Sequence, residues 1–271
     1  MTLKLYGQPR AAVTVDMSNP LAYGLIGCWV VTGDSLLPRN IAGGVTDSPN
    51  ILNGGAGIAA VVASEGFALQ QNGSSLGGIG SSLIENITEG EITVLVAAAF
   101  ATSNPVSNSP LAISIGSVQG VDTSFNVGIW DNQYLWCDMG NDYTYRPIPG
   151  GFSPNTPVMI GAVLNGDLSR AFYFNGIRVG GEAAAKGPYA GNAGVALMQQ
   201  RSIQTANTAM NGLFYLGYVW NRALISTEFA LLAATPFAFL QPATGTLSRL
   251  AAISTNGGRT GPFRLSIGVG M

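Results

Sequence analysis

Short apolar runs separated by glycine-rich turns cover most of the chain. Ile92–Phe100 is a charge-free run that begins with β-branched residues, which is typical of a buried strand. Leu111–Gly116 and Phe125–Trp130 alternate apolar and small or polar positions with a period of two. After a turn at Asp131-Asn132, Gln133–Cys137 is expected to return as a hairpin partner. These patterns predict β-strands.

The same pattern continues in the second half of the chain. The dipeptide Asn175-Gly176 signals a type I′ turn between two of the strands. Strands spaced about 8–14 residues apart, with glycine turns throughout, indicate a β-sandwich or jelly roll. The further strands are predicted at Val158–Asn165, Arg170–Phe174, Ile177–Val179, Val195–Gln199 and Gly212–Trp220. Trp29 and Trp220 lie within strand patterns and are expected in the core.

One segment has a helical period instead. In Ser226–Ala234, Phe229, Leu232 and Ala233 are spaced i, i+3, i+4 and would form a buried stripe, and Pro236 follows the end. The sequence therefore predicts one short helix near the C-terminus.

We expect a single domain at residues 19–242, preceded by an N-terminal arm at 1–18 and followed by an extension at 243–271. The extension carries Arg249, Arg259 and Arg264 and no acidic residue. Such terminal segments could add strands to another chain.

The composition and net charge of the chain exclude several classes of function. The 271 residues include only 12 basic and 14 acidic ones, and no histidine. Without histidine there is no Ser-His-Asp triad, no Cys-His dyad and no imidazole ligand for zinc. A net charge of −2 argues against a nucleic-acid binder. The start of the chain does not resemble a signal peptide, and the apolar run Val94–Ala101 is too short to span a membrane.

The two cysteines, Cys28 and Cys137, do not make a disulfide framework. Free buried thiols are the simpler interpretation, and a single disulfide is the alternative.

Several segments resemble motifs of the laminin-G-like, concanavalin A-like jelly-roll family. They follow the family's order across roughly residues 19–240. The resemblance is closest to the variants in tailed-bacteriophage virion proteins. The segments are Asn19–Trp29, Gly66–Ser75, Glu91–Ala99, Phe172–Gly176 and Val219–Glu228. The resemblance implies an all-β sandwich jelly roll with one short C-terminal helix and extended terminal arms.

The sequence departs from this family at two places. Gln71 and Asn72 stand where calcium-binding members carry acids, so oxygen ligands of that kind are missing. Ile225 stands where the family's helix is capped by serine, which leaves either a cap at Ser226 or a weaker helix start.

Acidic residues are the first candidates for a catalytic or metal-binding site. Glu89 and Glu91 have the spacing of two residues on one strand face, but their context is a turn, and solvated acids explain them. The segment Asp138–Asp142, with Asp131, supplies few oxygens for a cation, and turn chemistry explains it. We therefore expect a protein that is not an enzyme, with no catalytic residue, cofactor or metal.

Aromatic residues are the better candidates for a binding site. Five of them lie close together, with pairs spaced to share a strand face: Trp130, Tyr134, Trp136, Tyr143 and Tyr145. Exposed rings beside Asp or Asn side chains would suit a glycan. The alternative is that the rings fill the core or a subunit interface.

Few charges, aromatic residues and terminal arms favour association with other subunits. Together with the resemblance, they predict a structural virion protein of a tailed bacteriophage. It would be a capsid decoration, cement or head-fibre protein on the particle surface, made in the host cytoplasm. Its partners would be other copies, as a homotrimer, and proteins such as the major capsid protein. No nucleic acid or membrane partner is expected. The alternative function is a carbohydrate-binding module for a host-surface glycan, on a tail fibre or spike.

Overall fold

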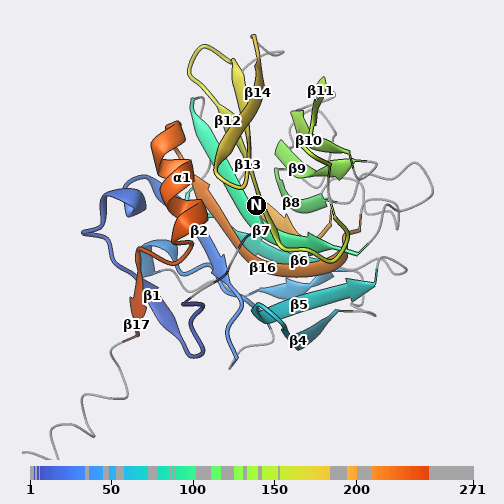
Figure 1. The fold of residues 1–271 in the computed structure, drawn as a ribbon. Helices are drawn as coiled ribbons and strands as arrows, with labels where there is room; N and C mark the ends of the chain where they lie inside the picture. The colour runs from blue at the N-terminus through green and yellow to red at the C-terminus, as the bar shows by residue number, and fades with distance from the viewer. Residues whose placement is uncertain are drawn as a thin grey trace, which may run out of the picture.

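The structure is a computed structural model in which two β-sheets lie face to face (Figure 1). The all-β sandwich predicted from the sequence is confirmed. Helix α1 spans Ser226–Ala234, the range that the apolar period indicated. The residues that the structure describes are 3, 5, 7–33, 37–44, 49–52, 58–72, 78–85, 87, 90–101, 111–116, 125–130, 133–139, 142–151, 153–183, 194–199 and 209–243.

Within these residues, sheet I has seven strands in the order β11-β10-β9-β8-β15-β6-β3. All of its neighbouring strands are antiparallel. The strands of sheet I are β3 (Asn50–Ile51), β6 (Ile79–Ser82), β8 (Leu111–Ile115), β9 (Phe125–Trp130), β10 (Tyr134–Met139), β11 (Asp142–Pro147) and β15 (Gly194–Leu197).

Sheet II has the described order β14-β13-β12-β7-β16-β5-β4, and β2 pairs with β16 beside this path. Its pairs are antiparallel as well. Its strands are β2 (Leu25–Val30), β4 (Ala59–Ala63), β5 (Gly66–Asn72), β7 (Ile92–Phe100), β12 (Val158–Leu164), β13 (Arg170–Phe174), β14 (Ile177–Glu182) and β16 (Asn211–Trp220).

The inter-sheet core fills the space between the two sheets. Strand alternation builds it, because every second residue of a strand points to the same face. Phe125, Val127 and Ile129 of β9 all belong to this core. Trp29 of β2 is fully buried, as predicted, and its indole N–H donates to the Ser81 hydroxyl at 2.7 Å.

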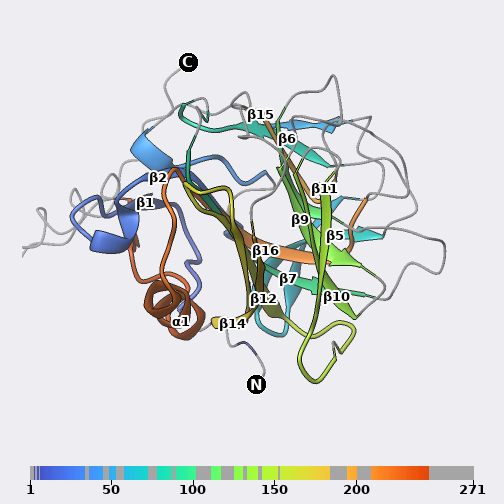
Figure 2. The same cartoon turned by 90° about the horizontal axis from the view of Figure 1, so that it is seen from above.

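An outer core covers the other face of sheet II (Figure 2). Leu95, Ala97 and Ala99 of β7 belong to this outer core, whereas the residues between them face the inter-sheet core. The strand is therefore buried on both faces, which explains why its sequence is continuously apolar rather than alternating. Helix α1 closes the outer core, where the Phe229 ring stacks on Tyr173 at 3.7 Å between ring centroids.

The two ends of the domain meet on this outer side. Strand β1 (Val13–Val15) pairs with β17 (Leu240–Pro242) of the same chain. Leu3 and Leu5 are buried in the outer core. Residues of the predicted N-terminal arm thus pack against the sandwich of their own chain. The predicted C-terminal extension lies outside the described residues from residue 244 onward.

The start of α1 differs from the predicted cap. Ile225 is the N-cap residue, and its N–H donates to the Glu228 carboxylate at 2.9 Å. The Ser226 hydroxyl lies 3.2 Å from the Tyr173 hydroxyl, so of the two alternatives for the helix start, the cap at Ser226 is wrong. The type I′ turn was right, because Asn175 and Gly176 have φ values of 48° and 82°.

Both cysteines are free and buried. Cys28 belongs to the outer core and Cys137 to the inter-sheet core, which places them on opposite sides of sheet II. Burial raises the pKa of the Cys28 thiol well above its ordinary value. Among the described residues, no helix combines the length and hydropathy needed to cross a bilayer.

Candidate functional site

The five aromatic candidates lie on three consecutive strands. Strands β9, β10 and β11 form a meander at one end of sheet I. Leu135 and Cys137 of β10 belong to the inter-sheet core, so Tyr134 and Trp136 lie on the outer face by alternation. Tyr145 of β11 lies on the same face, because it pairs directly with Trp136 and directly paired residues share a face. The pairs are Tyr134 with Trp130, Trp136 with Tyr145, and Asp138 with Tyr143.

The structure describes three of these aromatic side chains. Tyr134 and Tyr145 are half-buried, and their rings meet edge to face at 6.5 Å between centroids. Trp136 is only 3% exposed, although it lies on the outer face. Of the three described rings, those of the two tyrosines therefore present accessible surface, while the nearly buried Trp136 pairs with Tyr145 in the strand register. For Trp130 and Tyr143 only the backbone is described.

The inward-facing residues of β11 tie this site to sheet II. The Thr144 hydroxyl donates to the carboxylate of Glu182 on β14. Arg146 donates to the Gly181 carbonyl at 2.8 Å, and its guanidinium lies 5.7 Å from the centroid of the Phe172 ring. Because these residues flank Tyr145 in sequence, the contacts to sheet II set the position of that ring on the other face.

An ion pair between a buried arginine and a partly exposed glutamate completes this connection. Arg170 of β13 is 2% exposed, and its guanidinium lies 3.8 Å from the Glu182 carboxylate. A buried guanidinium requires a partner of opposite charge, so Glu182 serves both β11 and β13.

Sequence reasoning had missed these supporting residues. The signal was present in Tyr143–Arg146, where aromatic and polar residues alternate. The alternation implies that polar side chains face the sandwich interior if the rings face outward.

The carboxylate candidates do not gather into a site. Glu91 accepts the backbone N–H of Ala223 at 3.1 Å, which is a structural role, and Glu89 lies outside the described residues. The side chains of Asp131, Asp138 and Asp142 also lie outside them. In the described part of the chain, no three His, Cys, Asp or Glu side chains come close enough together to hold a metal ion.

No known protein-family model matches the sequence, and no curated protein sequence matches it. Solved structures do match. The binding domain of Paraclostridial Mosquitocidal Protein 1 superposes with a TM-score of 0.61 at 14% identity, over 80% of this chain and 53% of that one. The fold is a jelly-roll β-sandwich.

Two further structures support this fold. Domain 4 of AbnA, a GH43 extracellular arabinanase from Geobacillus stearothermophilus, was solved in complex with arabinotriose. It matches with a TM-score of 0.57 at 16% identity, over 77% of this chain and 98% of that domain. Trypanosoma rangeli sialidase, in complex with sialic acid, has the same TM-score and identity over 80% of this chain and 34% of its own.

The jelly roll thus spans about half of the mosquitocidal binding domain and about a third of the sialidase, but nearly all of the arabinanase domain. At these identities the likeness establishes the fold.

Proposed function

We propose that this protein is a carbohydrate-binding domain whose glycan contacts the outer face of β9, β10 and β11. The observation that carries the proposal is the pair of half-buried rings, Tyr134 and Tyr145, which lie 6.5 Å apart on that face. Aromatic rings bind sugars because their faces stack on the apolar C–H side of the ring, while neighbouring polar groups bond the hydroxyls.

The structural neighbours support this choice over other binding functions. The arabinanase domain was solved with an arabino-oligosaccharide, and a binding domain of botulinum neurotoxin DC was solved in complex with SialylT. The arabinanase domain is the more informative of the two, because this chain covers 98% of its length.

The proposed domain binds without catalysis. The chain has no histidine, and Glu91 of the Glu89/Glu91 pair is engaged by a backbone N–H. The predicted place on a bacteriophage particle stays a prediction, and a glycan-binding domain on a virion would satisfy both functions.

Glycan binding is tested by applying the purified protein to a broad glycan array that includes arabino-oligosaccharides and sialylated glycans. The best hit is then titrated against the wild type, Tyr134→Ala and Tyr145→Ala. Losing one stacked ring is expected to weaken binding about tenfold, equivalent to about 1.4 kcal/mol.

Tyr23→Ala is the matched control, because Tyr23 is an exposed tyrosine, 76% accessible, on a different element. It should bind like the wild type. A wild type that binds no glycan on the array, or equal affinities for all four proteins, would overturn the proposal.

The predicted homotrimer has its own test. Native mass spectrometry of the purified chain would show trimers if association is the function. A stable monomer at micromolar concentration would contradict the trimer and leave the glycan proposal untouched.

A further inference from the structure

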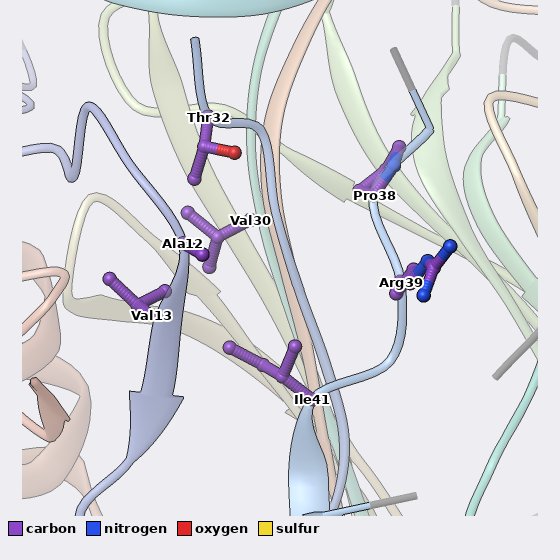
Figure 3. A pocket seen from close by; sticks show the side chains of 7 residues that line it. All are labelled: Ala12, Val13, Val30, Thr32, Pro38, Arg39 and Ile41. Atoms are coloured by element: carbon purple, nitrogen blue, oxygen red, sulfur yellow. The ribbon is translucent and has the colours of Figure 1, made fainter. Parts of the chain in front are cut away.

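A small pocket opens on the outer side of sheet II, away from the aromatic face (Figure 3). Its volume is about 280 Å³, close to the lower end of the range for small-molecule sites, roughly 300–1,000 Å³. Its lining residues come from three short segments of the first 41 residues: Ala12, Val13, Val30, Thr32, Pro38, Arg39 and Ile41.

The pocket exists because the outer core is incomplete at this place. Val30 of β2 belongs to that core, and Thr32 continues the same face of the chain by alternation. Further along sheet II, α1 and the buried ends of the chain cover this side. At this place β1 lies on one side of the pocket, and residues 38–41 lie on the other (Figure 3).

Hydrogen bonds hold in place the wall of the pocket that residues 38–41 form. The Ile41 N–H donates to the Cys28 carbonyl at 2.9 Å, which fixes residues 38–41 beside β2. The buried Asn40 side chain accepts the Cys28 N–H at 2.9 Å and donates to the Ile26 carbonyl at 3.1 Å. The pocket is therefore built into the fold.

Strand β1 offers backbone polar groups at the other wall. The Asp16 N–H donates to the Phe239 carbonyl, and the Ala243 N–H donates to the Ala12 carbonyl. Residues 12 and 16 thus direct their backbone groups toward β17. Because backbone direction alternates along a strand, Val13 directs its N–H and C=O away from β17, on the edge that borders the pocket.

Arg39 supplies the one charge among the lining residues. It is exposed, and no described residue makes an ion pair or hydrogen bond with its side chain. A guanidinium is preorganised to bind a carboxylate through two parallel hydrogen bonds. The other lining side chains are aliphatic apart from the Thr32 hydroxyl, so they suit a ligand with an apolar body.

We propose that this pocket binds a small organic acid, in which a carboxylate is attached to a branched aliphatic or single-ring aromatic body. The carboxylate contacts Arg39, and the body packs on Val30, Pro38 and Ile41. A sugar suits the pocket poorly, because its hydroxyl groups would face aliphatic side chains and lose their hydrogen bonds. The site is therefore separate from the proposed glycan face in place and in ligand chemistry.

Isothermal titration with phenylacetate and isocaproate tests this assignment, with phenylacetamide and acetate as matched probes. Phenylacetamide keeps the ring without the charge, and acetate keeps the charge without the body. One of the two larger acids should bind at least tenfold more tightly than both probes. If neither acid binds more tightly than about 1 mM, the proposal is overturned.

Three variants locate the site. Arg39→Gln should reduce the affinity for the acid to that for the amide, and Ala12→Phe should abolish binding by placing a ring in the opening. Arg178→Gln removes a surface arginine of β14 and should bind like the wild type. Thermal unfolding confirms that each variant folds.

Equal binding by Arg39→Gln and Arg178→Gln would place the acid elsewhere and overturn the assignment. The same titrations with Tyr145→Ala should be unchanged, so this proposal and the glycan proposal can fail independently.

Discussion

Arg222 and Glu228 form a two-pronged ion pair at the start of α1. The two guanidinium nitrogens lie 2.9 and 2.7 Å from the two carboxylate oxygens. Arg222 also donates to the Tyr23 carbonyl at 2.8 Å, and Glu228 accepts the Ile225 N–H at 2.9 Å. One carboxylate therefore caps the helix while its arginine partner ties that helix to the beginning of the domain.

This pair predicts a pH dependence of stability. Burial alone would raise the pKa of Glu228, but hydrogen bonds from Arg222 and the Ile225 N–H outweigh it, so the pKa lies below its ordinary value of 4.5. The charged carboxylate thus stabilises the fold at pH values above 4.5. This contribution is lost as the pH falls through the lowered pKa.

Denaturant unfolding of Glu228→Gln measures this contribution. At neutral pH the variant should lose about 1–2 kcal/mol of unfolding free energy. The difference from wild type should shrink as the pH falls below 4.5. A difference that stays constant down to the acid transition would contradict the assigned role. Glu85→Gln is a suitable comparison, because its partner Asn221 is neutral.

Two glycines with positive φ should respond very differently to alanine. At Gly176, with φ of 82°, a Cβ would lie 2.7 Å from the Ala233 Cβ and 3.0 Å from the Phe229 carbonyl oxygen. At Gly150, with φ of 77°, a Cβ would meet no atom within 4 Å. Gly150→Ala should cost about 1 kcal/mol from backbone strain.

Gly176→Ala should cost about 2 kcal/mol more, because the new methyl group pushes α1 away from the turn. Thermal and denaturant unfolding of both variants test this. Equal losses of stability would show that the contact between the turn and α1 is unimportant.

The cysteines should be unreactive in the folded protein. Both are buried and free, and the raised pKa of Cys28 keeps its thiol protonated at neutral pH. A thiol reagent such as dithionitrobenzoate should label neither residue under native conditions and both in denaturant. Mass spectrometry without reductant should show two free thiols, and rapid native labelling or a disulfide mass would contradict the structure.

Arg146 is predicted to act as a positioning residue for the glycan face. Arg146→Ala removes the hydrogen bond to the Gly181 carbonyl and the contact with the Phe172 ring. Hydrogen exchange of the β11 amides should become faster, and glycan affinity should fall although Arg146 lies on the opposite face from the rings. Arg178→Ala on β14 is the control and should change neither measurement.

The local parts of this fold were predictable. The range of β9 and that of α1 equal the predicted ranges, because periods of two and 3.6 residues depend only on neighbouring positions. The meander of β9, β10 and β11 brings the positions of the aromatic residues onto neighbouring strands, as their short sequence separation indicates.

The non-local parts were not predictable. Alternation fixes the face on which Trp136 lies, but it does not say how deeply that face is covered, and Trp136 is 3% exposed. The pairing of β1 with β17 joins segments from opposite ends of the domain, and no local pattern signals such a contact. The pocket beside Arg39 depends on the same pairing and was not foreseen.

Contacts between the two ends of the domain, of which the pairing of β1 with β17 is one, have a consequence for folding during synthesis. Asn19 donates a hydrogen bond to the Ala238 carbonyl, and the Trp220 indole donates to the Leu21 carbonyl. These partners of residues 19–21 leave the ribosome many seconds after them, at about 5–20 residues per second. Leu3 and Leu5 belong to the same outer core as Leu224, Phe229 and Phe239, so this core cannot be complete before those late residues are made. The outer core of the nascent chain therefore stays incomplete until synthesis of the domain is nearly complete.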